Sequence, residues 1–374
     1  MEDVACRSHG RERGTVGSVN GPIIDRCREI EHMTPREIIR RVLEHDNPPR
    51  IGFTYSKYDG KTRLNDTARC GPAGNPDFEP NRREDGEGGE LWEDEWGCTW
   101  RRLIDWTKGG EVVEPAISSR EDLEAYEPPD LDNPARYERC AEVRADNPDH
   151  YLLGSLTGCC FNRARYLPTF PTYLEWCASD PDLVDDINKM VSDIVIGQVD
   201  IYAEHGFDGV TFAEDWGTQD RLLVSPPMWD RMFKWTFERL LERAHGHGMT
   251  VWMHSCGAMT DIIAPLVELG MDVFQFDQQS VHGLDLLGEF SDRTTFWCPV
   301  DIQKVLPTGD QELIQDYACL MVEKMGQNGG FIAKDYTDNA SIGVDPLWQH
   351  WGYEAFKECG VSDPDEANIG AAEL

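Results

Sequence analysis

Between residues 207 and 357, short apolar runs alternate with longer segments whose apolar residues recur at helical spacing. The runs cover residues 207–212, 249–253, 273–276, 294–297 and 330–333, and the segments between and after them cover 227–246, 259–269, 284–290, 311–325 and 346–357. Short apolar runs separated by amphipathic helices are typical of βαβ units, which place their strands in one parallel sheet. This alternation constrains the fold more than any other feature of the sequence.

Two further apolar runs, at residues 51–55 and 151–157, bring the expected number of strands to seven. One more strand would close a (β/α)8 barrel of the TIM type, and an open, doubly wound sheet is the alternative. Because no glycine-rich phosphate loop follows the first strand, a dinucleotide-binding fold has no positive support. We therefore predict an α/β fold, a TIM-type barrel with some distortion, an N-terminal extension and inserted excursions.

Two parts of the chain are predicted to lie outside the barrel framework. Residues 1–33 show no periodicity and are expected to form a tail, so that the barrel domain spans residues 34–374 and begins at the capping box of Thr34 and Glu37. Residues 56–149 are largely polar and predict excursions, with no core element at 56–90. Within them, the tryptophans at 92, 96, 100 and 106 indicate the strands of a hairpin or cap.

Composition restricts the partners of the protein. The chain carries 69 Asp and Glu against 35 Lys and Arg, a formal charge of −34, and so negative a field repels the phosphates of nucleic acid. Such a surface is strongly hydrated and would also suit high salt. No run approaches the roughly 20 apolar residues of a membrane span, and Met1–Arg13 lacks the apolar core of a signal peptide. We expect a cytoplasmic protein, in which the twelve cysteines stay reduced.

Polar residues follow five of the predicted strands. The active site of a TIM-type barrel lies at the carboxyl ends of its strands, so these residues are candidates for chemistry. They are Glu214-Asp215, His254-Ser255-Cys256, Asp277-Gln278-Gln279, Cys298 with Asp301 and Gln303, and Lys334-Asp335-Tyr336. A barrel with a purely structural role would not need them.

The pair His254 and Cys256 gives the most specific signal. Alternate residues of an extended segment point the same way, so the imidazole and the thiolate can share one cation. Zn²⁺ takes nitrogen and sulfur ligands, and a catalytic zinc site has three protein ligands and one open position. An ordinary core or loop pair is the alternative; the strand-end position and the following Gly257 favour a functional pair.

Each of the remaining candidates is a polar residue with two possible interpretations, a functional role and a structural one. Glu214 and Asp215 are adjacent, so one side chain is expected to face the pocket and the other to turn aside. As the predicted catalytic pair they would carry a proton, bind metal or accept hydrogen bonds from substrate, and the alternative is a helix or loop cap. The predicted substrate-binding residues, which could instead satisfy loop backbone, are Gln219, Gln279, Asp301, Gln303 and Tyr336.

At these residues the sequence resembles the uroporphyrinogen decarboxylase superfamily. The resemblance runs from about Thr34 to Gly360 and is carried by GFDGVTFAEDWGTQDRLL, HGMTVWMHSCGAM, FWCPVDIQKVLPTG and GGFIAKDYTDN. It implies a TIM-type barrel. The arginine-rich substrate motif of the decarboxylases is absent, because Arg50–Tyr55 stands in its place. The segments EDWGTQ and HSCG are more similar to the cobalamin-dependent methyltransferase branch.

That branch implies a methyl group moved between a small substrate, or a thiol or folate acceptor, and cobalamin on a partner corrinoid protein. In its thiol-methylating members zinc is held by an H-x-C pair, here His254 and Cys256, and by a cysteine near the last strand. No cysteine stands there in this sequence, so we expect Cys298 as the third ligand, with Glu214 and Asp335 as alternatives.

Two other functions stay open. A lyase acting on a small carboxylated substrate would need basic residues at the barrel mouth, for which the candidates are Arg163, Arg165, Arg221 and Lys334. A corrinoid- or metal-binding accessory protein would bind without turnover. The sequence does not decide between a monomer and a homodimer.

Overall fold

The computed structural model describes residues 33–103, 109–326 and 329–361. The chain divides into two units, Met1–Met33 and Thr34–Leu374, and the second unit is described below. The predicted N-terminal tail, the segment Met1–Arg13 and Trp106 lie outside the described residues. In the part of the chain that the structure describes, no helix has the length and apolar character needed to cross a membrane.

Eight strands form one sheet in the order β1-β12-β11-β10-β9-β8-β7-β2, and every ladder between neighbours in this order is parallel. The strands are β1 (Gly52–Thr54), β2 (Thr67–Cys70), β7 (Tyr151–Ser155), β8 (Gly209–Ala213), β9 (Thr250–His254), β10 (Val273–Gln275), β11 (Thr295–Cys298) and β12 (Phe331–Lys334). Strands and helices alternate from β7 to the end of the described chain. The predicted TIM-type barrel is therefore confirmed.

The barrel is nearly closed where β1 meets the residues that lead into β2. Asp66 joins the two segments: its backbone N–H donates to Phe53 O at 2.7 Å, and its carboxylate accepts from Phe53 N at 2.8 Å. Arg50 adds an ion pair to the same carboxylate at 2.7 Å. The bridge between Thr54 and Asn65 is antiparallel, which is the distortion of an otherwise parallel barrel.

The eighth strand, β2, corrects the prediction that residues 56–90 contain no core element. It has only four residues, of which Thr67 and Cys70 are buried and Arg69 is exposed. So short a strand, with two polar residues among its four, offers no apolar run by which it can be recognised. Its pairing with β7 over all four residues fixes it in the sheet.

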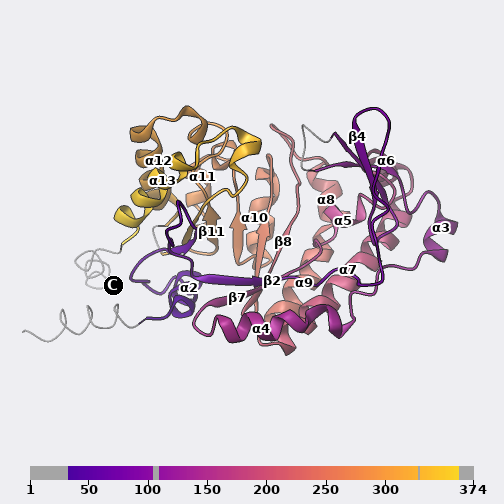
Figure 1. Ribbon diagram of the computed structural model, residues 1–374, viewed down its shortest axis with the longest axis horizontal. Helices are drawn as coiled ribbons and strands as arrows, with labels where there is room; N and C mark the ends of the chain where they lie inside the picture. The colour runs from indigo at the N-terminus through magenta and orange to yellow at the C-terminus, as the bar shows by residue number, and fades with distance from the viewer. Residues whose placement is uncertain (1–32, 104–108, 327–328, 362–374) are drawn as a thin grey trace, which may run out of the picture. The chain divides into compact units, whose positions relative to one another are not determined.

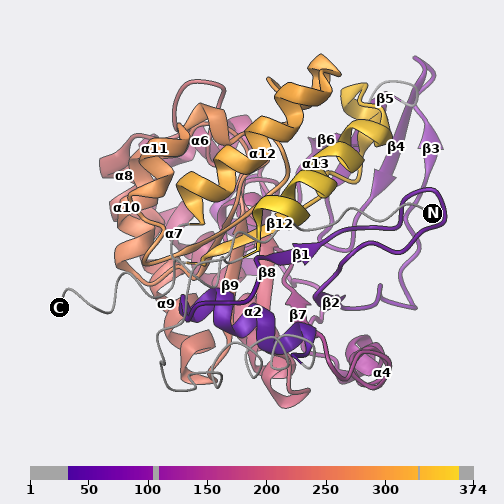
Figure 2. The same cartoon turned by 90° about the vertical axis from the view of Figure 1, so that its left-hand side faces the viewer.

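Helices cover the outside of the sheet, and α12 and α13 lie side by side (Figures 1 and 2). The capping box of Thr34 and Glu37 opens α2 as predicted. The helix expected over 227–246 is interrupted at Phe233. The helices are α2 (Pro35–Glu44), α3 (Arg120–Ala125), α4 (Glu138–Asp146), α5 (Phe161–Ala164), α6 (Phe170–Ser179), α7 (Pro181–Glu204), α8 (Pro226–Met232), α9 (Lys234–Gly246), α10 (Thr260–Glu268), α11 (Leu284–Gly288), α12 (Gln311–Met325) and α13 (Pro346–Cys359), with the 3₁₀ turns η1 (Pro134–Tyr137), η2 (Gln279–Val281), η3 (Leu306–Thr308) and η4 (Asn339–Ile342).

A second, antiparallel sheet is inserted between β2 and β7. Its strands are β3 (Arg83–Glu84), β4 (Gly89–Glu93), β5 (Thr99–Leu103) and β6 (Glu111–Glu114), in that order. In Figure 1 this sheet, labelled at β4, lies on the other side of the barrel from α12 and α13. Trp92 and Trp100 face each other across β4 and β5 with ring centroids 6.0 Å apart. The hairpin predicted from the tryptophans is confirmed.

Two tryptophans fill the interior of the barrel below its carboxyl-terminal mouth. The rings of Trp252 on β9 and Trp297 on β11 meet at 5.4 Å although another strand separates β9 from β11, so both point inward. Trp297 Nε1 also donates to Thr54 Oγ1 on β1 at 2.6 Å. Because side chains alternate along a strand, His254 lies on the same inner face as Trp252 and closer to the mouth.

Candidate metal centre

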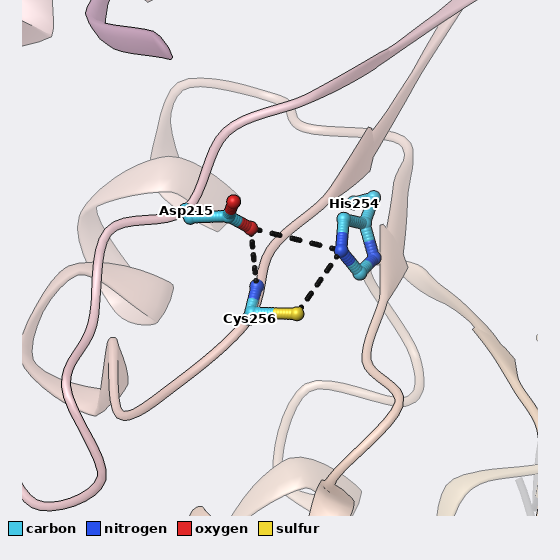
Figure 3. A group of neighbouring side chains, drawn as sticks. All are labelled: Asp215, His254 and Cys256. Atoms are coloured by element: carbon cyan, nitrogen blue, oxygen red, sulfur yellow. Dashed lines mark hydrogen bonds and ion pairs between the residues drawn. The ribbon is translucent and has the colours of Figure 1, made fainter. Parts of the chain in front are cut away.

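Three potential metal ligands meet at the ends of β8 and β9, which are neighbours in the sheet (Figure 3). The Cys256 Sγ lies 3.3 Å from His254 Nε2, and Asp215 Oδ1 lies 3.7 Å from the same nitrogen. All three ligand atoms are within 4.8 Å of one another. Within residues 33–103, 109–326 and 329–361, no other group of three or more His, Cys, Asp or Glu side chains comes this close.

Two glycines allow the two loops to approach. Gly257 has a φ of +76°, and a Cβ atom there would overlap the backbone of Gly217. A Cβ atom at Gly217 would in turn overlap the backbone of Gly257 and Ala258. This contact brings Cys256 N within 3.2 Å of Asp215 Oδ1, to which it donates. The backbone of one loop therefore positions the carboxylate of the other.

The imidazole of His254 is held from its far side. Its Nδ1 bonds Gln275 Oε1, while Gln275 Nε2 donates to Asp277 Oδ1 at 2.7 Å. Because the amide oxygen is an acceptor, this network places the ring proton on Nδ1 and leaves the Nε2 lone pair toward Cys256 and Asp215. Gln275, at the end of β10, therefore holds the imidazole in the orientation that a metal ligand needs.

The charge states of the Cys256 thiol and the Asp215 carboxylate both depend on whether a cation is bound. Burial and the nearby carboxylates of Asp215 and Asp277 raise the pKa of Cys256 to about 12, so the sulfur keeps its proton at neutral pH unless a cation replaces it. Asp215 is anchored by Arg165, whose Nη1 donates to its carbonyl oxygen at 3.2 Å and whose Nη2 lies 3.9 Å from Oδ2. The cation that would ionise the sulfur would also neutralise the carboxylate.

These residues fit a zinc ion. At a tetrahedral angle, Zn–S, Zn–N and Zn–O bonds of about 2.3, 2.0 and 2.0 Å place sulfur and nitrogen about 3.5 Å apart, and nitrogen and oxygen about 3.3 Å apart. The observed separations of 3.3 Å for sulfur and nitrogen and 3.7 Å for nitrogen and oxygen lie within about 0.4 Å of those values. Three protein ligands leave the fourth position open, as in catalytic zinc sites. In this group the third potential ligand is Asp215, where the sequence led us to expect Cys298.

Glu214 turns away from the group. It is fully buried and accepts hydrogen bonds from the backbone N–H groups of Cys159, Cys160 and Asn162 at 2.7, 3.1 and 3.1 Å. Burial raises its pKa to about 7. The expected divergence of the two adjacent acids is observed: Asp215 faces the ligands, and Glu214 caps the loop after β7. The catalytic role of Glu214 stays a prediction, and in this structure its carboxylate accepts hydrogen bonds from the backbone.

The other predicted residues after β10 and β11 mostly serve the loops. Gln279 Nε2 donates to Phe276 O and Pro299 O, both at 2.7 Å. The fully buried carboxylate of Asp301 accepts from the backbone N–H groups of Ser280, Gln303 and Lys304. Cys298 is fully buried and does not join the metal group.

The remaining candidates have varied surroundings. Gln219 and Gln303 are exposed. Tyr336 is half-buried, and burial and the charges of Asp277, Asp338 and Cys256 raise its pKa. Asp335, an alternative third ligand, instead bonds Arg63 at 2.6 Å.

All four basic residues considered for carboxylate binding have an acidic partner. Arg163 pairs with Asp94, Arg165 with Asp215, Arg221 with Asp220, and Lys334 with Asp277. Lys334 also lines a cavity together with residues of β1 and β2. Sequence reasoning missed Gln275, although its position two residues before Asp277 puts both on one face of the strand.

Comparison with known proteins gives one family and several structures. The profile of the family described as "Uroporphyrinogen decarboxylase (URO-D)" matches residues 104–334. A methyltransferase from Methanosarcina mazei is similar with a TM-score of 0.52 at 14% identity, over 87% of this chain and 99% of that one. A D-psicose 3-epimerase from Clostridium cellulolyticum H10 has a TM-score of 0.40 at 10% identity, over 64% of this chain and 85% of that one. No curated protein sequence matches the chain.

Proposed function

The chain belongs to the uroporphyrinogen decarboxylase family, and from that premise we propose that it is a zinc-dependent methyltransferase that methylates a small thiol. The methyl donor is cobalamin carried by a partner corrinoid protein. One observation carries the proposal: Asp215 completes a set of three ligands with His254 and Cys256 and leaves a fourth position for the substrate sulfur. The fold shared with a methyltransferase over 99% of the length of that protein is consistent with it.

The residues of the chain have separate tasks in this reaction. Asp215, His254 and Cys256 hold the ion, Gln275 fixes the imidazole tautomer, and Arg165 keeps Asp215 in place. Zinc bound there would lower the pKa of a substrate thiol, so that a thiolate exists at neutral pH.

Methyl transfer then requires that the methyl group on cobalt reach the substrate sulfur. The substrate sulfur forms a bond to the methyl carbon as the cobalt–carbon bond breaks, and the electron pair of that bond stays with cobalt. The barrel mouth, where the strand ends lie, is the face that the partner must approach.

The test combines zinc analysis with methyl transfer from methylcobalamin to a panel of small thiols. We expect about one zinc per chain and thiol-dependent loss of the methyl–cobalt absorption. Asp215→Asn should lower both, whereas Asp220→Asn, which changes an exposed acid five positions further along the chain, should change neither. Protein without zinc would refute the metal centre, and zinc-loaded protein inactive with every thiol would refute the proposed acceptor.

A further inference from the structure

All ten cysteines of the described residues are free thiols, and seven of them are buried. The other three are half-buried. One of these, Cys256, belongs to the metal group, whereas Cys319 lies on α12 and Cys359 ends α13. Cys319 and Cys359 are therefore accessible thiols outside the metal centre, and the proposed methyl transfer uses neither of them.

The thiols of Cys319 and Cys359 meet at one backbone oxygen. Cys319 Sγ lies 3.9 Å from Ala355 O, and Cys359 Sγ donates to the same oxygen at 2.9 Å. The two helices lie side by side, so each of them brings one sulfur to this oxygen (Figure 2). The thiols also interact with each other, because burial and a hydrogen bond with Cys319 raise the pKa of Cys359.

The position of Cys359 connects this pair to the closure of the barrel. Cys359 is the last residue of α13, and the next residue, Gly360, accepts at its carbonyl oxygen from Ile51 N at 2.8 Å, directly before β1. Because the end of a helix is less constrained than its interior, Cys359 can adjust to a sulfur–sulfur bond of about 2.05 Å. A covalent bond between the two thiols would fasten this end of α13, and the segment that leads into β1, to α12.

We propose that Cys319 and Cys359 form a site of reversible oxidation, at which a low-molecular-weight disulfide converts the two thiols into a disulfide bond between α12 and α13. Because its raised pKa keeps Cys359 protonated, the Cys319 sulfur attacks first, as a thiolate. The bond between the two sulfurs of the small disulfide breaks, and one thiolate leaves.

The second step closes the bond within the protein. The Cys359 sulfur, after losing its proton, attacks the Cys319 sulfur of the mixed disulfide and releases the second small thiolate. In total the protein gives up two electrons and two protons, and the small disulfide is reduced to two thiols.

A second pair of thiols provides a comparison. Cys70 on β2 and Cys140 on α4 also form a hydrogen bond, but only 3% and 0% of their surfaces are exposed. Thiol–disulfide exchange depends on access of the reagent to the attacking sulfur. The pair of Cys319 and Cys359 should therefore be oxidised before the buried pair.

The test incubates the full-length protein with 2-hydroxyethyl disulfide, which carries no charge and is therefore not repelled by a chain of net charge −34. Peptide mapping without reduction should identify peptides joined through Cys319 and Cys359. The midpoint of thermal unfolding should rise by about 5 °C, because the bond closes a loop of about 40 residues, and dithiothreitol should reverse the rise.

Matched variants separate this pair from the other thiols. Cys319→Ser and Cys359→Ser should each abolish the joined peptides and the rise in the midpoint, whereas Cys140→Ser should retain both. Circular dichroism verifies the fold of each variant, and alanine replaces serine where a serine variant does not fold. The oxidation repeated in Cys256→Ser should give the same joined peptides, which keeps the result independent of the metal centre and of methyl transfer.

Three outcomes would contradict the proposal. Mixed disulfides alone at Cys319 and Cys359, or peptides joined through Cys70 and Cys140 in their place, would overturn the oxidation site. A bond between Cys319 and Cys359 at an unchanged unfolding midpoint would overturn the fastening of α13.

Discussion

The loops after β8 and β9 and the loops after β10 and β11 are equally polar in sequence but differ in how their side chains are used. In the first pair, Asp215, His254 and Cys256 direct ligand atoms at one another and are partly exposed. In the second pair, Gln279 and Asp301 are fully buried and bond the loop backbone. A polar residue at a strand end is therefore a candidate for chemistry only when the backbone has not already used its hydrogen bonds.

The contrast has a simple origin in hydrogen-bond capacity. Asp301 accepts three backbone N–H groups, whereas Asp215 accepts one, from Cys256. The Cys256 thiol interacts with His254 and Asp215, and burial and the negative charges of Asp215 and Asp277 disfavour its thiolate form. Where several such side chains converge and their lone pairs are not used by hydrogen bonds, a metal ion can bind them.

The largest expected effect comes from removing a ligand at the first pair of loops. Cys256→Ser should lower zinc affinity at least about 100-fold, because loss of a ligand should cost no less than loss of an outer-shell partner. Elemental analysis after dialysis against a chelator measures it. Cys319→Ser, at another half-buried cysteine, is the control. Equal zinc content in the two variants would contradict the claim that the loops after β8 and β9 bind the metal.

Removing a hydrogen-bond acceptor from the loops after β10 and β11 should lower the stability of the protein and leave its zinc content unchanged. Asp301→Ala leaves three backbone N–H groups without their acceptor, so we expect the free energy of unfolding to fall by about 3 kcal/mol. Urea unfolding measures this fall, and zinc content should stay at the wild-type level. Asp316→Ala, at an exposed acid on α12, should change the unfolding free energy by less than about 0.5 kcal/mol. Loss of zinc at unchanged stability would place Asp301 with the ligands.

The stability of the protein should also depend on pH through a histidine in the loop after β10. Burial lowers the pKa of His282, which follows η2, to about 4 from the usual 6.5. The unfolded chain therefore binds a proton between these values and the folded chain does not, so stability present above pH 6.5 is lost as pH falls toward 4. Between pH 7 and 5 we expect about 2 kcal/mol less stability from this histidine.

Unfolding of the wild type and of His282→Gln at both pH values isolates that contribution, because the other titrating groups are common to the two proteins. The wild type should lose more stability than the variant on acidification. The same loss in both would show that the protonated ring is tolerated inside the fold.

The smallest effect is expected at Gln303. Its side chain is exposed, and its backbone N–H already bonds Asp301 at 2.9 Å. Steady-state kinetics of Gln303→Ala should give a KM within twofold of the wild type. A larger rise would bring the loop after β11 into the substrate site, as the sequence suggested.

The barrel was predictable because its later strands are apolar runs set between amphipathic helices. The sequence of β2 contains no such run, because Thr67 and Arg69 are polar and only its first and last residues, Thr67 and Cys70, are buried. Its place in the sheet depends on pairing with β7. Since that strand was not recognised, nothing in the sequence marked Arg69 as facing the barrel mouth. The place of this strand in the sheet could therefore be found only from the structure.

The metal group was predictable in part. Two of the candidate ligands are only two residues apart: His254 ends β9, and Cys256 follows in the next loop. Alternation along an extended segment was enough to predict that the two side chains point the same way. The third lies 41 residues from Cys256, and its choice depends on which of two adjacent acids turns inward. That is decided by the amides of Cys159, Cys160 and Asn162, which capture Glu214, and no local pattern reveals them.

The contact between Gly217 and Gly257 has a consequence for recognising such centres in other chains. A side chain at either glycine would drive the two loops apart, and Asp215 would no longer reach His254 and Cys256. The sequence signature of this centre is therefore in two parts, an acid followed two positions later by glycine and H-x-C followed at once by glycine. The convergence of the three side chains depends on these glycines as much as on the side chains themselves.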